Sequence, residues 1–242
     1  HRDLHYPLRR QRQMCIRDRI LAAGYGKRMN KLTHSIPKPL LKINNKELLR
    51  HNIDFFTNLG CKKIIINTHY LHDKVQHCIE RYYSDRNIII SYEPTLLNTG
   101  GGIKNALSSL GNNNFIVTNS DILWKENNSE DVLKFINNYQ EIETCKLLLA
   151  TDNNFIGLKK SVGDFSCKDS LVTRWKKNDP YLYYTGLQII NPIVFKLIEE
   201  VYFSLNQLWD LLIAKDTLRG EICHSKIAHI GDINAFNQFK DN

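Results

Sequence analysis

The sequence lacks most of the features that mark membrane, secreted or metal-stapled proteins. No apolar run approaches the roughly 20 residues that cross a bilayer, and no stretch joins a basic start to an apolar core as a signal peptide does. The six cysteines are scattered through 242 residues, with no Cys-x-x-Cys pair and no Cys/His cluster at zinc spacing. Such thiols are typical of a reducing compartment. Internal repeats are also missing. We therefore expect a cytoplasmic globular protein with no membrane partner.

Positive charge is in excess, and half of the excess lies in one short segment. The chain has 33 lysines and arginines against 25 acidic residues, a net charge of +8. Residues 1–19 contain six arginines and two aspartates but no lysine or asparagine, unlike the rest of the chain. This segment is predicted to be a disordered or non-native basic extension, outside the fold. The remaining charge suits a protein that handles phosphates, and no nucleic-acid partner is expected.

Residues 20–242 are predicted to form a single domain with two halves, 20–150 and 151–242. Short apolar runs alternate with helical patterns through the first half. The runs lie at 20–23, 63–67, 87–92 and 115–118, and the helical patterns at 46–59, 71–83 and 101–110. This alternation is typical of βαβ units. The second half has shorter strands, so the sequence predicts an α/β fold: a Rossmann-like, mostly parallel sheet flanked by helices, with a small mixed subdomain on one edge.

Two glycines, Gly24 and Gly26, follow the first predicted strand, and two cations, Arg28 and Lys38, come after them. Glycines let the backbone approach a ligand closely, and the N–H groups of such a loop can bind phosphate oxygens. A dinucleotide fingerprint would need glycine at Met29, and a Walker loop would need Gly-Lys-Ser/Thr; neither is present. A glycine loop with two fixed cations is instead suited to clamp a polyphosphate.

Residues 21–40, LAAGYGKRMNKLTHSIPKPL, resemble the signature of the sugar-1-phosphate nucleotidyltransferases, LAAGxGxRMxxLTxxxPKPL. The resemblance extends over residues 20–239. Residues 93–103 (EPTLLNTGGGI) are similar to the family's second nucleotide-binding segment, and residues 119–121 (NSD) stand at its Gly-Asp motif. Within the family, the chain resembles bacterial N-acetylmuramate-1-phosphate uridylyltransferases and mannose-1-phosphate guanylyltransferase-like proteins.

The resemblance implies a role for each part of these motifs. Arg28, Lys38 and Asp121 would be the catalytic residues. The nucleotide would be bound by residues of the glycine loop and of the second segment: Ala22, Ala23, Gly24, Gly26, Gly100 and Gly101. Asp121 follows a predicted strand, at the carboxyl edge where ligands of α/β sheets bind. Because a carboxylate facing a triphosphate needs a cation between them, we expect Mg²⁺ as the cofactor, with Asp121 as a ligand.

The second half is expected to bind the sugar 1-phosphate, since residues 184–186 (YTG) resemble the family's Phe-Thr-Gly segment. The expected substrate-binding residues are Asn119, Asp164, Gly186 and Asn206. The family's second metal-binding aspartate has no direct counterpart. When the chain is aligned on Gly231, His229 stands in its place and Asp232 in that of the following threonine. His229 is therefore expected to be the second metal ligand, with Asp232 as the open alternative.

The implied reaction joins an NTP and a sugar 1-phosphate into an NDP-sugar and pyrophosphate. UTP and N-acetylmuramate 1-phosphate are the expected substrates, which would make this a step of peptidoglycan recycling. GTP with mannose 1-phosphate is the first alternative. A non-catalytic regulatory paralogue that binds a nucleotide-sugar is the second, and His229 in place of an aspartate is the residue in its favour. The protein is expected to be a monomer or a homodimer.

Overall fold

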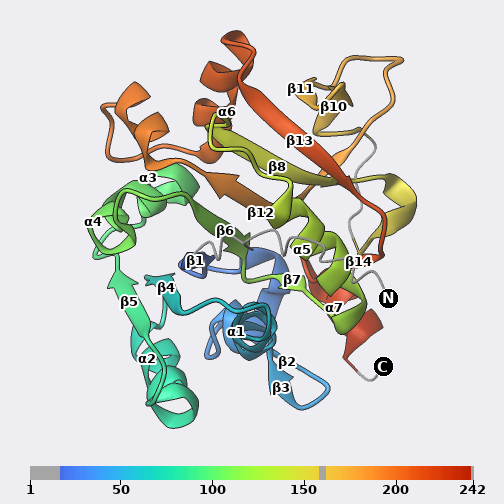
Figure 1. Ribbon diagram of the computed structural model, residues 1–242. Helices are drawn as coiled ribbons and strands as arrows, with labels where there is room; N and C mark the ends of the chain where they lie inside the picture. Colours follow the sequence, from blue (N-terminus) through green and yellow to red (C-terminus); the bar gives the residue numbers. More distant parts are fainter. Residues whose placement is uncertain (1–16, 158–161, 241–242) are drawn as a thin grey trace, which may run out of the picture.

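A nine-stranded sheet runs through the molecule (Figure 1). The structure is a computed structural model that describes residues 17–157 and 162–240. In spatial order, the strands are β10 (Phe165–Lys168), β11 (Leu171–Arg174), β13 (Leu218–Cys223), β8 (Cys145–Ala150), β12 (Tyr183–Ile190), β6 (Phe115–Asn119), β1 (Arg17–Leu21), β4 (Lys63–Thr68) and β5 (Ile88–Tyr92).

Most of this sheet is parallel, as the sequence predicts. β1 pairs in parallel with β4 and β6, which places Ile20 beside Ile66 on one side and Thr118 on the other. β12 is inserted antiparallel between β6 and β8, and β13 returns parallel to β8. The carboxyl ends of β1, β4 and β6 therefore meet at one edge, where ligands of such sheets bind.

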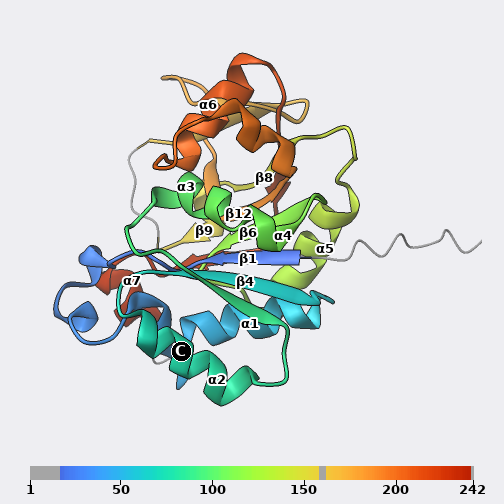
Figure 2. The same cartoon turned by 90° about the vertical axis from the view of Figure 1, so that its left-hand side faces the viewer.

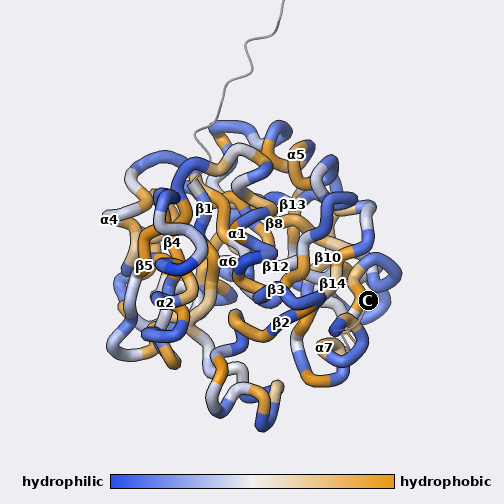
Figure 3. Tube along the Cα trace, turned by 90° about the horizontal axis from the view of Figure 1, so that it is seen from below, coloured by the Kyte–Doolittle hydropathy of each residue, from blue (hydrophilic) through white to orange (hydrophobic). Residues whose placement is uncertain are grey.

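Helices cover both faces of the sheet (Figure 2). On one face lie α1 (Leu48–Asn58), α2 (His72–Tyr83) and α5 (Ser129–Asn137), and on the other α3 (Asn98–Asn105), α4 (Leu107–Leu110) and α6 (Leu205–Ala214). In α1, Leu49, Ile53 and Phe56 recur at helical spacing, and all three are fully buried. Each such side chain contributes about 1.5–3 kcal/mol of burial free energy. Hydrophobic segments gather in the middle of the molecule, and the outer loops are largely hydrophilic (Figure 3).

Two smaller sheets complete the fold. One joins β7 (Ile122–Leu123), β14 (Ile227–His229) and β9 (Phe155–Ile156), and the other pairs β2 (Lys42–Ile43) with β3 (Lys46–Glu47). β14 places His229 opposite Ile122, so the end of the chain reaches the residues that follow β6. The last helix, α7 (Ile233–Phe239), packs beside this small sheet. In the part of the chain that the structure describes, no helix has the length and apolar character needed to cross a membrane.

The predicted boundary at residue 20 is wrong, because β1 begins at Arg17. Asp18 and Arg19 are both fully buried in the sheet. The apolar pattern of the sequence does not indicate this start of the strand, because both residues are charged and charged side chains are almost never fully buried without a partner. The rest of the expected basic extension, residues 1–16, lies outside the described residues.

One predicted helix is divided in the structure. The helix expected at 101–110 is interrupted at Ala106, which separates α3 from α4, and α3 begins earlier, at Asn98. In the second half, Pro192–Leu197 forms a 3-10 helix. The second half also shares the main sheet with the first: β12 and β13 flank β8 from both sides, so the mixed subdomain is a continuation of that sheet.

Candidate functional site

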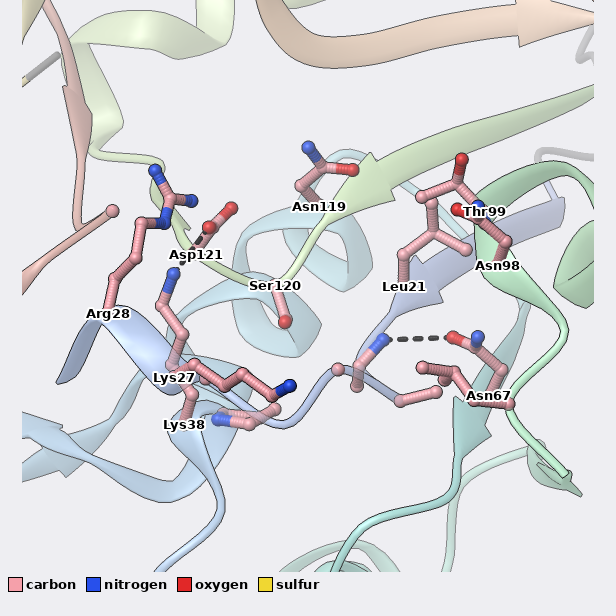
Figure 4. A pocket seen from close by; sticks show the side chains of 17 residues that line it. Leu21, Lys27, Arg28, Lys38, Asn67, Asn98, Thr99, Asn119, Ser120 and Asp121 are labelled. Atoms are coloured by element: carbon pink, nitrogen blue, oxygen red, sulfur yellow. Dashed lines mark hydrogen bonds and ion pairs between the residues drawn. The ribbon is translucent and has the colours of Figure 1, made fainter. Parts of the chain in front are cut away.

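A cavity of about 410 Å³ opens at the carboxyl ends of β1, β4 and β6; we call it the larger pocket (Figure 4). Cationic side chains and Asp121 gather at one end of it, and Asn98 and Thr99 line the other. Eight of the predicted site residues line this cavity: Ala22, Ala23, Gly24, Gly26, Arg28, Lys38, Asn119 and Asp121.

The first loop, residues 22–34, takes its shape from its glycines. Gly26 has a φ of +65°, and a Cβ there would lie 3.0 Å from both Lys38 Cβ and Thr33 Cγ2. Only glycine fits this conformation without strain. A Cβ on Gly24, in contrast, would meet nothing within 4 Å, because Gly24 faces open space in the cavity. The loop therefore leaves room for a ligand directly against the Gly24 backbone.

One carboxylate oxygen of Asp121 holds two partners. Lys38 Nζ lies 2.6 Å from Asp121 Oδ2, and His229 Nε2 lies 3.4 Å from the same atom. Burial alone would raise the pKa of Asp121, but the Lys38 ammonium and the His229 imidazole outweigh it and hold this pKa well below its usual range. Arg28 is exposed and has no ion pair within the described residues, so its guanidinium is available to an anionic ligand.

His229 is held against Asp121 by its surroundings. Its ring stacks on Phe155, with centroids 5.5 Å apart, and a Cβ on Gly231 would lie 2.4 Å from the ring. Asp232 instead starts α7, where its Oδ1 accepts a hydrogen bond from the backbone N–H of Ala235. Of the two candidates for the second metal position, His229 is therefore the one that faces Asp121.

The donor set fits Mg²⁺ only if substrate phosphates complete it. The described residues contain no group of three or more histidine, cysteine or acidic side chains that could hold a metal. Asp121 lines the larger pocket and His229 lines the smaller one, and their side chains approach to 3.4 Å where the two cavities adjoin. Mg²⁺ is usually bound by one or two carboxylates together with substrate phosphates and water. The residues present therefore fit a magnesium ion that binds with a nucleotide.

A second cavity of about 320 Å³, the smaller pocket, adjoins the first and shares Arg28, Thr99 and Asn119 with it. The predicted substrate-binding residues all line it: Asn119, Asp164, Gly186 and Asn206. A register shift in β12 between Tyr184 and Gln188 brings Gly186 to this wall. Gly186 has a φ of +86°, and a Cβ there would lie 2.7 Å from Ile122 Cγ1, so glycine is required.

Gly100 and Gly101 do not line either cavity. Their backbone N–H groups both donate to Phe203 O, at 3.0 Å each. A Cβ would lie 2.3 Å from the Phe203 ring at Gly100 and 2.1 Å from Val201 O at Gly101. The close approach that these glycines allow in this structure is thus to the chain before α6, and their contact with the nucleotide stays a prediction.

Several residues that line the two cavities are not among the predicted site residues. Asn67, Lys27 and Ser120 lie in the larger pocket, and Phe165, Tyr184 and Trp209 in the smaller one. Asn67 carried one usable signal, because it is the first polar residue after the apolar run 64–66 of a parallel strand. Tyr184 belongs to the segment 184–186 that resembles the family's Phe-Thr-Gly motif, but an aromatic side chain alone does not indicate a site, because such side chains are more often part of a core.

Comparisons with known proteins agree with this arrangement. Residues 19–155 match the family described as nucleotidyl transferase. N-acetylmuramate alpha-1-phosphate uridylyltransferase of Caulobacter vibrioides is 30% identical over 224 residues, which are 89% of this chain and 92% of that protein. Mannose-1-phosphate guanyltransferase 2 of Candida glabrata is 29% identical over 185 residues, 74% of this chain and 51% of that protein.

Solved structures share the fold. HddC from Yersinia pseudotuberculosis, complexed with GMP-PN, aligns with a TM-score of 0.74 at 20% identity, over 93% of this chain and 97% of that one. A putative glucose-1-phosphate thymidylyltransferase from Bacillus anthracis aligns with a TM-score of 0.76 at 15% identity, over 93% of this chain and 94% of that one. The central sheet and its helices are therefore an arrangement that these proteins have in common.

Proposed function

The chain belongs to the nucleotidyl transferase family, as a sugar-1-phosphate nucleotidyltransferase, and on this premise we propose that it joins UTP to N-acetylmuramate 1-phosphate. The products would be the UDP-sugar and pyrophosphate, a reaction that serves peptidoglycan recycling. The observation that carries this choice is the similarity to the Caulobacter vibrioides uridylyltransferase over 89% of the chain. The two adjoining cavities support it, since each can take one substrate.

The triphosphate lies in the larger pocket, along the first loop, and the sugar phosphate enters from the smaller one. The α-phosphate then sits at the junction of the cavities, beside Arg28 and Asn119. An oxygen of the sugar phosphate attacks the α-phosphorus, and the bond from the α-phosphorus to the bridging oxygen of pyrophosphate breaks. The attacking oxygen is already anionic at pH 7, so no general base is required, and catalysis rests on positioning and charge neutralisation.

Two cationic side chains and a bound metal ion would neutralise charge in this scheme. Arg28 binds phosphate oxygens with its free guanidinium, and Lys38 stabilises the charge that develops on the α-phosphate and on pyrophosphate. Asp121 and His229 are the residues that would hold Mg²⁺. When bound, this ion supplies Lewis-acid polarisation of the phosphate oxygens.

A second candidate, transfer of GMP from GTP to mannose 1-phosphate, is favoured by the similarity to the Candida glabrata guanyltransferase over 74% of the chain. The two candidates share the chemistry and differ in the base and the sugar. The base would be distinguished by the residues at the end of the larger pocket away from the cations, and the sugar by the residues that line the smaller pocket.

Pyrophosphate release tests the proposal directly. The purified chain with Mg²⁺ is supplied with UTP, GTP, CTP or dTTP, each against the 1-phosphates of N-acetylmuramate, N-acetylglucosamine, glucose and mannose. We expect release chiefly with UTP and N-acetylmuramate 1-phosphate. Release chiefly with GTP and mannose 1-phosphate would replace the first candidate by the second. A folded protein that binds nucleotide but releases no pyrophosphate in any combination would indicate a regulatory paralogue.

A further inference from the structure

We infer that residues 67–70, at the end of β4 and in the turn after it, are a positioning element for the nucleotide. Side chains of residues 67–70, which we call the β4 brace, connect the first loop (residues 22–34) to the second segment (residues 93–103). These two stretches form opposite walls of the larger pocket. The inference rests on nucleotide binding in that pocket and not on the choice of UTP or of the sugar.

Asn67 makes the central link. Its Oδ1 accepts a hydrogen bond of 2.9 Å from the backbone N–H of Ala22, and its Nδ2 donates one of 2.7 Å to Glu93 Oε1. Asn67 is 3% exposed and Glu93 is fully buried, so water does not compete for these bonds. A buried polar group that loses its partner destabilises the fold, so both hydrogen bonds of Asn67 are strongly maintained.

Glu93 passes the connection on to the second segment. Its Oε2 accepts a hydrogen bond of 3.0 Å from the backbone N–H of Leu97, just before α3. A Cβ on Gly102 would lie 2.6 Å from Glu93 Oε1, so the helix that carries Asn98 and Thr99 packs directly on this carboxylate. The position of that wall is therefore fixed relative to Asn67.

His69 makes a second, parallel link. Its Nδ1 lies 2.7 Å from Glu93 O, and its Nε2 lies 3.0 Å from the hydroxyl of Tyr25, between the two loop glycines. Because a carbonyl can only accept, Nδ1 carries the proton and Nε2 accepts from Tyr25. Tyr70 adds a third contact, since its hydroxyl lies 2.9 Å from Thr33 O and 3.0 Å from His34 O and shares its one proton between these carbonyls. The brace thus holds the first loop at three points.

A nucleotide that contacts both walls depends on their spacing. Loss of the brace would weaken contacts that are made equally in the ground state and the transition state, which raises KM and leaves kcat nearly unchanged. The sugar-facing residues Asp164, Gly186 and Asn206 belong to other elements, on the far side of the shared Arg28. The affinity for the sugar 1-phosphate should therefore change little.

The test compares Asn67→Ala with a matched control, Asn128→Ala. Asn128 is also a fully buried asparagine, bonded to Lys125 N, Ser225 Oγ and Lys226 O, and it lines neither cavity. We expect Asn67→Ala to raise the Kd for UTP or GTP, whichever binds the wild type more tightly, by about tenfold. Each variant removes the hydrogen bonds of one buried asparagine, so both should lower the melting temperature by a similar amount. Asn128→Ala should nevertheless leave this Kd unchanged. Equal Kd values for the two variants would overturn the inference.

Two further variants keep the result interpretable. Tyr25→Phe removes a hydroxyl from an exposed side chain, so the fold survives, and a rise in the nucleotide Kd is expected from it as well. The double variant with Asn67→Ala and Glu93→Gln should bind nucleotide no more weakly than the single variant with the higher Kd, because the two substitutions break the same connection. Fully additive losses of nucleotide affinity in the double variant would contradict a brace. So would nucleotide Kd values that are unchanged in both single variants, Tyr25→Phe and Asn67→Ala. Calorimetric binding gives these results even if no sugar 1-phosphate is turned over, so failure of the proposed substrates stays separate.

Discussion

Lys38 Nζ and His229 Nε2 converge on a single oxygen of Asp121, at 2.6 and 3.4 Å. The carboxylate is 17% exposed and is anchored through Oδ2, while Oδ1 has no hydrogen bond within the described residues. Its orientation is therefore set from two sides before any ligand binds. Such preorganisation is what a site that works by positioning and charge requires.

Removal of the Asp121 charge should abolish most of the activity and leave the fold intact. Asp121→Asn keeps the shape of the side chain but loses the anion that would hold Mg²⁺, so we expect kcat to fall by about a hundredfold or more. Steady-state pyrophosphate release measures the change, with a melting curve to establish folding. Asp73→Asn, at a fully exposed aspartate, is the control. Near-normal turnover in folded Asp121→Asn would remove Asp121 from the site.

The two cations should differ in their effect on stability. Lys38→Met and Arg28→Met should each reduce kcat/KM, the former by about 3 kcal/mol of transition-state stabilisation. Lys38→Met also leaves the Asp121 carboxylate without its ammonium partner, so its melting temperature should fall. Arg28 is exposed and unpaired in the described structure, so Arg28→Met should melt like the wild type. The prediction fails if Arg28→Met is the less stable of the two.

Alanine substitutions at Gly24 and Gly101 should distinguish a glycine that contacts the ligand from one that is needed for packing. Gly24→Ala adds a Cβ with nothing within 4 Å, so stability should be unchanged, while the methyl group should obstruct the nucleotide and raise its Kd about tenfold. Gly101→Ala drives a Cβ to 2.1 Å from Val201 O and should cost about 1–3 kcal/mol of unfolding free energy. Calorimetry and urea unfolding on both variants give the comparison. A stable Gly101→Ala with weak nucleotide binding would reverse our assignment of that glycine.

Asp18 should destabilise the protein. It is fully buried in β1 beside Ile64 and Ile116, and among residues 17–157 and 162–240 neither of its carboxylate oxygens has a hydrogen-bond partner. Burial raises the pKa of this carboxyl well above its usual value. Asp18→Val should therefore increase the free energy of unfolding at pH 7 by about 1–3 kcal/mol, as measured by urea denaturation.

The same carboxyl predicts the sign of a pH effect. Above the ordinary aspartate pKa of about 4, the unfolded chain has released the proton that folded Asp18 retains, so stability falls as the pH rises toward the raised pKa. Unfolding at pH 5 and pH 8 should show this loss in the wild type and less of it in Asp18→Val. Both values stay below the pKa of Arg19, which burial lowers to about 9. Equal slopes in the two proteins would contradict the prediction.

The glycine loop and its cations were predictable because they lie close together in the sequence. Gly24, Gly26, Arg28 and Lys38 span fifteen residues and enter one cavity, and the strand before Asp121 ends where its apolar run ends. The role of Asn67 was not predictable from its own neighbourhood, because its partners Ala22 and Glu93 are brought to it by two other strands.

Other differences come from tertiary contacts that override local pattern. Gly100 and Gly101 lie in a segment that resembles a nucleotide-binding motif, yet their N–H groups donate to Phe203 O, about a hundred residues later in the chain. β1 includes Asp18 and Arg19 because the register with β4 and β6 continues past the apolar run. Neither contact can be predicted from the residues that neighbour it in the sequence.

The place of β12 in the main sheet has a consequence for engineering this enzyme. β12 belongs to the second half of the chain but lies between β6 and β8 of the first half, and its shifted register carries Gly186 to the smaller pocket. A fragment that stopped at residue 150 would leave two strands with open edges, which invite aggregation. The second half of the chain is therefore not an exchangeable unit: a transplant from a relative must bring a strand whose pairing and register shift match both β6 and β8.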